Sequence, residues 1–188
     1  MHIQEAIETR RSIRRFQGRP VKQEILTKLV DLARLHASGG NLQPLRYAIV
    51  SEQPLRDQLF AELKWAMYLP EFEILPSQRP GAYIVILSDT QVRKACQYDL
   101  GAASTTMMLA AREYGLDTCA LGAFSAKEVS RLLDLPEALH PELVLAIGYR
   151  AQESTVVPME GSVRYTMDDQ GNLRVPKWSL EEVLVMNK

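Results

Sequence analysis

Cysteine and histidine are scarce in this sequence, and the few that occur are scattered. The two cysteines, Cys96 and Cys119, form no CxxC pair and have no histidine nearby at metal-site spacing. They indicate neither a disulfide framework nor a metal centre. We interpret the three separated histidines, His2, His36 and His140, as surface or helix-end residues rather than ligands. Reduced thiols favour a cytoplasmic setting.

Long hydrophobic runs and an excess of one charge are also missing. No stretch approaches the ~20 apolar residues that span a bilayer, and the N-terminus lacks the apolar core of a signal peptide. We therefore expect a cytoplasmic protein without a membrane partner. A formal net charge of -1 argues against general nucleic-acid binding. The content of 46% hydrophobic and 24% charged residues is typical of a globular protein, and we expect one domain over 1–188.

Common catalytic and nucleotide-binding motifs are absent as well. The sequence has no GxSxG, no HExxH, no phosphate loop ending in GKS or GKT, and no GxGxxG after a predicted strand. Asp99 and Asp117 have no evident acidic partner for acid–base catalysis. If the protein is an enzyme, a bound cofactor must therefore supply the difficult chemistry.

What the sequence does contain is a dense basic stretch near its start, Thr9–Phe16, which we call the arginine segment. Its four arginines are Arg10, Arg11, Arg14 and Arg15. Like charges this close repel one another, so the cluster costs free energy unless an anion binds among them. The planar guanidinium suits phosphate, because it can donate two parallel hydrogen bonds. Taken alone, such a run is more often a solvated basic face.

Hydrophobic periodicity and helix-breaking residues predict an alternation of helices and strands. The predicted helices are His2–Arg10, Val21–Ala37, Pro54–Leu69, Val92–Tyr114 and Ser125–Leu133. The predicted strands are Leu45–Val50, Ala82–Leu87, Asp117–Leu121 and Leu143–Gly148. Because the helix at 92–114 is apolar nearly all round, we expect it to be buried in the core or at a subunit interface.

Four stretches interrupt this alternation. Ala37–Pro44 is either a helix stop with a turn or a loop whose glycines let the backbone approach a ligand. Trp65–Pro80 is apolar and broken by prolines, and packed loop is the more common interpretation than a pocket wall. We expect Arg150–Asn172 to be irregular, ending in a hairpin turn at Asp168–Asn172. A capping box at 179–182 opens a last helix that must dock on the body or on a partner chain.

Taken in order, several of these motifs resemble those of the FMN-dependent nitroreductase family. They match its opening basic signature, its second loop, its central helix with the following strand, its late strand and its C-terminal basic motif. The matching stretches are Arg10–Arg14, Ala37–Pro44, Asp99–Ala103, Tyr114–Phe124, Ala146–Tyr149 and Val175–Glu182. The resemblance covers nearly the whole chain, and its strength lies in the combination.

The resemblance implies an α+β fold, a three-layer α/β/α sandwich with a central mixed, mainly antiparallel sheet. It also implies an intertwined homodimer with two FMN sites at the interface. A C-terminal extension, about residues 150–188, would pack on the partner subunit. The FMN-binding residues carried over by position are Arg10, Arg11, Ser12, Arg14, Ser38, Gly39, Asn41, Leu121, Gly122, Ala123 and Lys177.

The same resemblance implies which residues meet the phosphate end of FMN. Arg10, Ser12 and Lys177 would hold the phosphate, and Arg11 would supply a backbone contact. Arg14 would lie near the pyrimidine edge of the flavin, where a cation stabilises the anionic reduced ring.

Two further groups are implied around the ring. Ser38, Gly39 and Asn41 would come from the other subunit. Gly122 and its two neighbours would present backbone N–H groups to flavin N5 and O4, and a glycine leaves the backbone open to a ring. No side chain is implied as catalytic and no metal is implied, because flavin N5 carries the hydride.

The implied function is an oxidoreductase with a ping-pong mechanism. NAD(P)H reduces the flavin and leaves, and a nitroaromatic, quinone or similar electron-poor acceptor then takes the electrons. The chain departs from the family pattern at Trp178, where a second basic residue is common, and at Leu45, where an aromatic residue is usual. Two alternatives therefore stay open: a flavin-binding dimer without turnover, and a same-fold FMN enzyme that performs dehalogenation or flavin breakdown.

Overall fold

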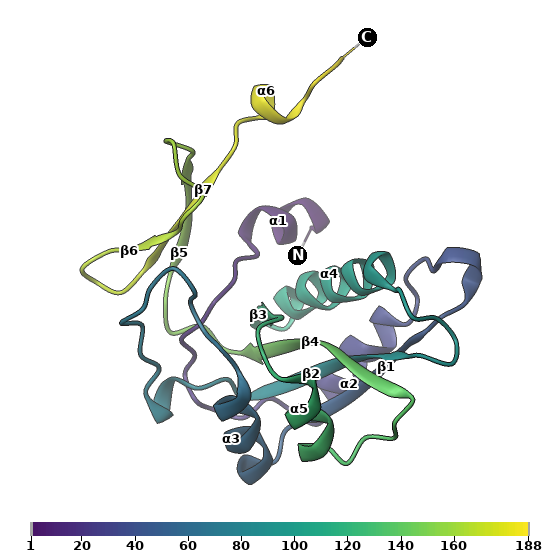
Figure 1. The fold of residues 1–188 in the computed structure, drawn as a ribbon. Coiled ribbons are helices and arrows are strands. Elements are labelled where there is room, and N and C mark those ends of the chain that lie inside the picture. The colour runs from purple at the N-terminus through teal and green to yellow at the C-terminus, as the bar shows by residue number, and fades with distance from the viewer. Residues whose placement is uncertain (1, 188) are drawn as a thin grey trace.

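The computed structural model describes residues 2–187 and shows a central sheet with helices on both faces (Figure 1). All four strands pair antiparallel in the order β1–β2–β4–β3. The strands are β1 (Leu45–Val50), β2 (Ala82–Asp89), β3 (Asp117–Leu121) and β4 (Leu139–Gly148). A bridge between Ser12 and Thr118 adds a parallel pairing beside β3. The predicted three-layer α+β fold with a mainly antiparallel sheet is confirmed.

Each face of the sheet has its own hydrophobic cluster. The helices are α1 (Ile3–Thr9), α2 (Gln23–Ala33), α3 (Gln53–Glu62), α4 (Gln97–Glu113) and α5 (Ala126–Leu132). Helices α2 and α4 cover one face, and α3 and α5 cover the other (Figure 1). Strand β2 is buried throughout as far as Ser88, and its side chains alternate between the two clusters. This explains the unbroken apolar run from which the strand was predicted.

Three predicted helices are shorter than expected. Helix α2 spans Gln23–Ala33 rather than Val21–Ala37. Helix α3 ends at Glu62 rather than Leu69, because Leu63 pairs with Phe124 in a β-bridge and Ala66 adopts a positive φ of 47°. Helix α4 begins at Gln97 rather than at residue 92. It buries one side against α2 and leaves Gly101 exposed, so within one chain it is not covered all round.

The prediction that residues 150–172 are irregular is wrong for part of that stretch. Strands β5 (Ser154–Pro158), β6 (Thr166–Met167) and β7 (Leu173–Lys177) form a second sheet in the order β5–β7–β6. The expected hairpin turn at 168–172 is confirmed, since the Gly171 N–H donates to the Asp168 carbonyl at 2.9 Å. The two strands before this turn are short and mostly exposed, so they carry little hydrophobic signal.

The end of the chain extends away from the body (Figure 1). Helix α6 (Leu180–Val183) has the predicted capping box, with Ser179 and Glu182 bonding each other's backbone N–H groups. Leu180 is 66% exposed and Val185 is 94% exposed. Most of the apolar surface of this helix is therefore uncovered by residues 2–187, and its docking on a partner remains a prediction. None of the helices in residues 2–187 is both long enough and apolar enough to cross a membrane.

Candidate functional site

The arginine segment is fixed along the edge of the sheet by two buried apolar side chains. Ile13 and Phe16 are fully buried in the cluster under α3 and α5. The Ile13 N–H donates to the Thr118 carbonyl at 3.0 Å, which holds the segment against β3. Because these two buried side chains anchor the backbone, the arginines beside them are held in place at the edge of the sheet.

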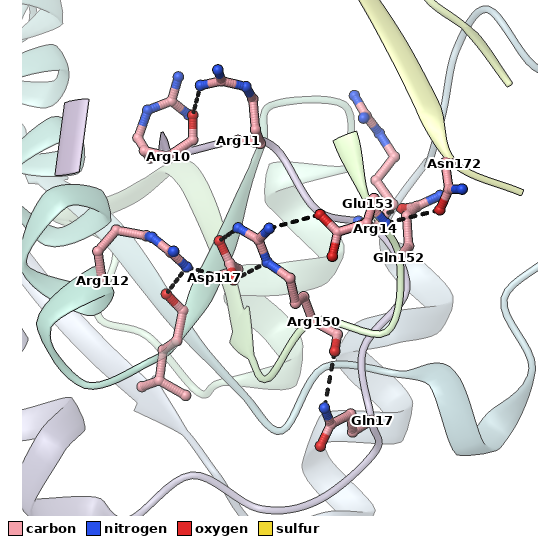
Figure 2. Close-up of polar contacts among 11 residues, drawn as sticks. Arg10, Arg11, Arg14, Gln17, Arg112, Asp117, Arg150, Gln152, Glu153 and Asn172 are labelled. Atoms are coloured by element: carbon pink, nitrogen blue, oxygen red, sulfur yellow. Dashed lines mark hydrogen bonds and ion pairs between the residues drawn. The ribbon is translucent and has the colours of Figure 1, made fainter. Parts of the chain in front are cut away.

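Arginines outnumber carboxylates around this segment (Figure 2). Asp117 is 2% exposed and accepts from Arg112 Nη1 at 2.7 Å and from Arg150 Nε and Nη2 at 2.7 and 2.8 Å. Arg150 Nη1 donates to the exposed Glu153 at 3.0 Å. Within residues 2–187, no carboxylate forms an ion pair with Arg10, Arg11, Arg14 or Arg15.

This surplus of positive charge favours a bound anion. Burial lowers the pKa of the Arg11 guanidinium, and the charges of Arg10 and Arg150 lower it further. An anion among these groups would relieve the repulsion, and a phosphate would also accept their paired N–H groups. The solvated-face interpretation of the arginine segment is therefore disfavoured by its half-buried arginines.

The other end of β3 opens into a hollow. Gly122 and Ala123 follow the strand, and the Lys64 N–H donates to the Ala123 carbonyl at 3.0 Å. The hollow has a volume of about 520 Å³ and lies between residues 61–64 and 122–125. A side chain at Gly122 would meet no atom closer than 3.9 Å. Gly122 is four residues beyond Thr118, so ~13 Å of extended strand separates this open backbone from the arginine segment.

The loop at 38–41 lies at the opposite end of the sheet from the arginine segment (Figure 1). Strand pairing aligns Ser12 with Thr118 and, through β4, with Ala82 at the start of β2. The loop leads into Leu45, which pairs with Ser88 near the end of β2. Six residues of strand correspond to ~20 Å, and the four strand spacings from Ser12 to β1 add ~19 Å across the sheet. A single chain therefore does not bring Ser38, Gly39 and Asn41 to Arg10.

The C-terminal candidates lie on the second sheet. Lys177 ends β7, is exposed, and forms no ion pair within the described part of the chain. Trp178 is 55% exposed and lines a shallow hollow with Lys177 between β5 and α6. The second sheet meets the arginine segment through Arg14, whose guanidinium lies 4.5 Å from the centre of the Tyr165 ring.

The stretch 65–80 packs against the same region, which supports its interpretation as packed loop. Arg15 lies 4.6 Å from the centre of the Phe72 ring, and its Nη2 donates to the Glu73 carbonyl at 3.2 Å. Tyr68 contacts Tyr165 with ring centres 5.1 Å apart. The arginine segment thus lies between this stretch and the second sheet.

Sequence reasoning missed the charged residues behind the site. Asp117 was described as lacking an acidic partner, whereas its partners are two arginines. Arg112 lies in the last turn of α4, five residues before Asp117, so the sequence itself places the two close together. Arg150 follows Gly148, the residue that pairs with Asp117 across the sheet, and that register appears only in the structure. Gln152, which is buried and bonded to the Arg14 N–H, was missed as well.

Comparison with known proteins places this geometry in context. A family model described as "Nitroreductase family" matches residues 7–73 and 77–149. A protein of Methanothermobacter thermautotrophicus named "Putative NADH dehydrogenase/NAD(P)H nitroreductase" is 26% identical over 188 residues, covering 95% of this chain and 88% of its own.

Two solved structures show the same fold. A nitroreductase family protein from Clostridium difficile 630 has a TM-score of 0.67 and 25% identity, with 80% of this chain and 86% of that chain covered. An FMN-dependent nitroreductase from Clostridium difficile R20291 has a TM-score of 0.65 and 22% identity, with 79% and 87% covered. At 22% identity, the second likeness supports the fold alone.

Proposed function

This chain belongs to the nitroreductase family of NAD(P)H oxidoreductases, and we propose that it binds FMN at a site shared by two copies of itself. The proposal includes a ping-pong cycle with nitroaromatic, quinone or similar electron-poor acceptors. The observation that carries it is the surplus of half-buried arginines fixed beside β3. The motifs that resemble those of the FMN-dependent nitroreductase family make FMN the anion that we propose.

The phosphate end of the cofactor belongs at the arginine segment. Arg10 and Ser12 hold the phosphate, the Arg11 backbone contacts it, and Lys177 from the second sheet supplies another positive charge. A phosphate carries nearly two negative charges at neutral pH, so it balances guanidiniums that have no carboxylate.

The ring end belongs along β3, toward Gly122. The ~13 Å between Thr118 and Gly122 leaves room for an extended ligand, with its phosphate at the arginine segment and its ring near Gly122. Gly122 has free space above its backbone, so the N–H groups of residues 121–123 can face a flat ring. Arg14, held over Tyr165, provides the cation at the pyrimidine edge. When bound, FMN supplies the hydride chemistry itself.

The partner subunit completes the site. Since Ser38, Gly39 and Asn41 lie far from Arg10 in one chain, their contribution to the same cofactor requires a second copy. The C-terminal extension, about residues 150–188, packs on that copy. The partner then covers the apolar side chains of α6, which are exposed in one chain. We place the whole chain in one domain and the enzyme in the cytoplasm.

Anaerobic mixing with reduced nicotinamide tests the enzymatic part of this proposal. The purified protein is expected to be yellow, and NADPH or NADH should bleach it, after which a nitroaromatic or quinone should restore the colour. The visible absorption spectrum follows each step. A protein that stays colourless after incubation with FMN would refute the proposal.

A second candidate is a flavin-binding dimer without turnover, and Trp178 favours it. The tryptophan stands where a second basic residue is common in the family, so the phosphate loses one positive charge on that side. The same mixing experiment separates the two candidates. Colour that persists with both NADPH and NADH supports the binder.

Arg10→Ala is expected to weaken FMN binding by about 1.5–3 kcal/mol, roughly ten- to a hundred-fold, because a charge-assisted hydrogen bond to the phosphate is lost. Fluorescence titration of FMN measures the change. Arg131→Ala is the control, since that arginine is exposed and pairs only with Glu128 on α5. Equal FMN affinity in the Arg10 variant and the wild type would rule out this assignment.

A further inference from the structure

Residues 149–153, which we call the junction segment, connect the two parts of the chain that carry the proposed phosphate ligands. Two backbone hydrogen bonds of 2.9 Å join the junction segment to residues 15–17. Bonds of 2.9 and 3.0 Å join it to Leu173, the first residue of β7, and to Asn172 in the turn before it. The arginine segment and the second sheet are therefore held to one another through five residues.

Gln152 contacts both sides through its side-chain amide, and Figure 2 shows it beside Arg14. Its Oε1 accepts from the Arg14 N–H at 3.2 Å, and its Nε2 donates to the Gly171 carbonyl at 2.7 Å. The residue is only 6% exposed, so these bonds are shielded from competing water. Losing them would leave a partly buried N–H and a partly buried carbonyl without these partners.

The turn at Gly171 lies close against the arginine segment. A Cβ at this position would stand 2.7 Å from Arg15 Nη1, and the residue has a φ of +82°. Both facts explain why glycine occupies the position. Strand β7 starts two residues later at the fully buried Leu173 and ends at Lys177. A shift of the turn is thus carried along a short paired strand to Lys177.

We propose that Gln152 is a positioning residue that sets Lys177 in register with Arg10 at the phosphate end of the cofactor site. This inference rests on the proposed function, because it presupposes that FMN binds there. In the family pattern a second basic residue often follows the lysine, whereas this chain has Trp178. With one charge fewer on the tail, the placement of Lys177 matters more.

The test compares FMN with riboflavin, which has the same ring and no phosphate. Gln152→Met keeps the side-chain length and neutrality but makes neither bond. We expect FMN affinity to fall roughly tenfold, from the loss of buried hydrogen bonds, while riboflavin affinity changes much less. Gln17→Ala is the matched control, since it removes an exposed side-chain bond to the same junction segment at Arg150 and should change neither affinity. Equal losses for both ligands would indicate a purely structural role and overturn the inference.

A double-mutant cycle with Lys177 tests the route of the effect. If Gln152 acts by placing Lys177, adding Gln152→Met to Lys177→Ala should weaken FMN binding no further than Lys177→Ala alone. Additive losses would overturn the inference. If the methionine variant fails to fold, Gln152→Asn replaces it in both experiments, because the shorter amide cannot span the same two partners. A wild-type protein that does not bind FMN would instead refute the proposed function.

Discussion

Replacing Asp117 with asparagine is expected to lower the free energy of unfolding by about 3–5 kcal/mol, the usual cost of removing one partner from a buried ion pair. The carboxylate is almost fully buried and neutralises Arg112 and Arg150 at 2.7–2.8 Å. Arg112 is 14% exposed at its side chain, and its Nε already lacks a hydrogen-bond partner. Without Asp117, both guanidiniums lose their buried counterion beside the uncompensated arginine segment, and Arg150 keeps its ion pair with the exposed Glu153.

Urea unfolding at a fixed protein concentration measures this effect, because an oligomer's stability depends on concentration. Asp31→Asn is the matched control. Asp31 also accepts from two cations, Lys28 and Arg34, but it lies on an exposed helix surface. Exposed ion pairs contribute little, so the control should unfold at nearly the wild-type midpoint. If the Asp117 variant matched the control, the buried cluster would not be the stabilising element described above.

The parts of the fold that sequence reasoning predicted are those where burial follows a local pattern. The run Ala82–Leu87 is apolar at every position because β2 is buried on both faces. Strand β1 was predicted with its observed bounds, and Ser125 caps α5 as expected by accepting from the Glu128 N–H. In these elements a few neighbouring residues decide the structure, so the sequence is sufficient.

The missed features depend on contacts between distant residues. Helix α3 stops early because Leu63 pairs with Phe124, sixty-one positions away in the chain. The strands of the second sheet are stabilised by pairing with one another rather than by an apolar face, so periodicity does not reveal them. The arginine segment itself was found from its composition, whereas the buried ion pair between Asp117 and Arg150 beside it emerged only when the sheet register was known.

The proposed sharing of each FMN site between two subunits leads to the largest expected effect on cofactor content. Arg10 and Gly39 lie at opposite ends of the sheet in one chain, yet the proposal places them on one FMN. Arg10→Ala removes a phosphate ligand, and Gly39→Leu fills the space where the loop backbone approaches the ring. Each variant alone should form dimers in which both sites are damaged, with little FMN retained at a concentration that saturates the wild type.

Mixed dimers of these two variants are expected to regain half of the wild-type FMN content. One site then receives both substitutions, and the other receives an intact Arg10 from one chain and an intact Gly39 from its partner. Co-expression with two affinity tags isolates the mixed species, and its absorbance gives the flavin content per dimer. If both residues served a site within a single chain, every site in the mixed dimer would carry one substitution and no FMN would return. The two outcomes differ because a shared site combines Arg10 of one copy with the loop of the other. Within any one chain, the register of the sheet keeps these two parts far apart.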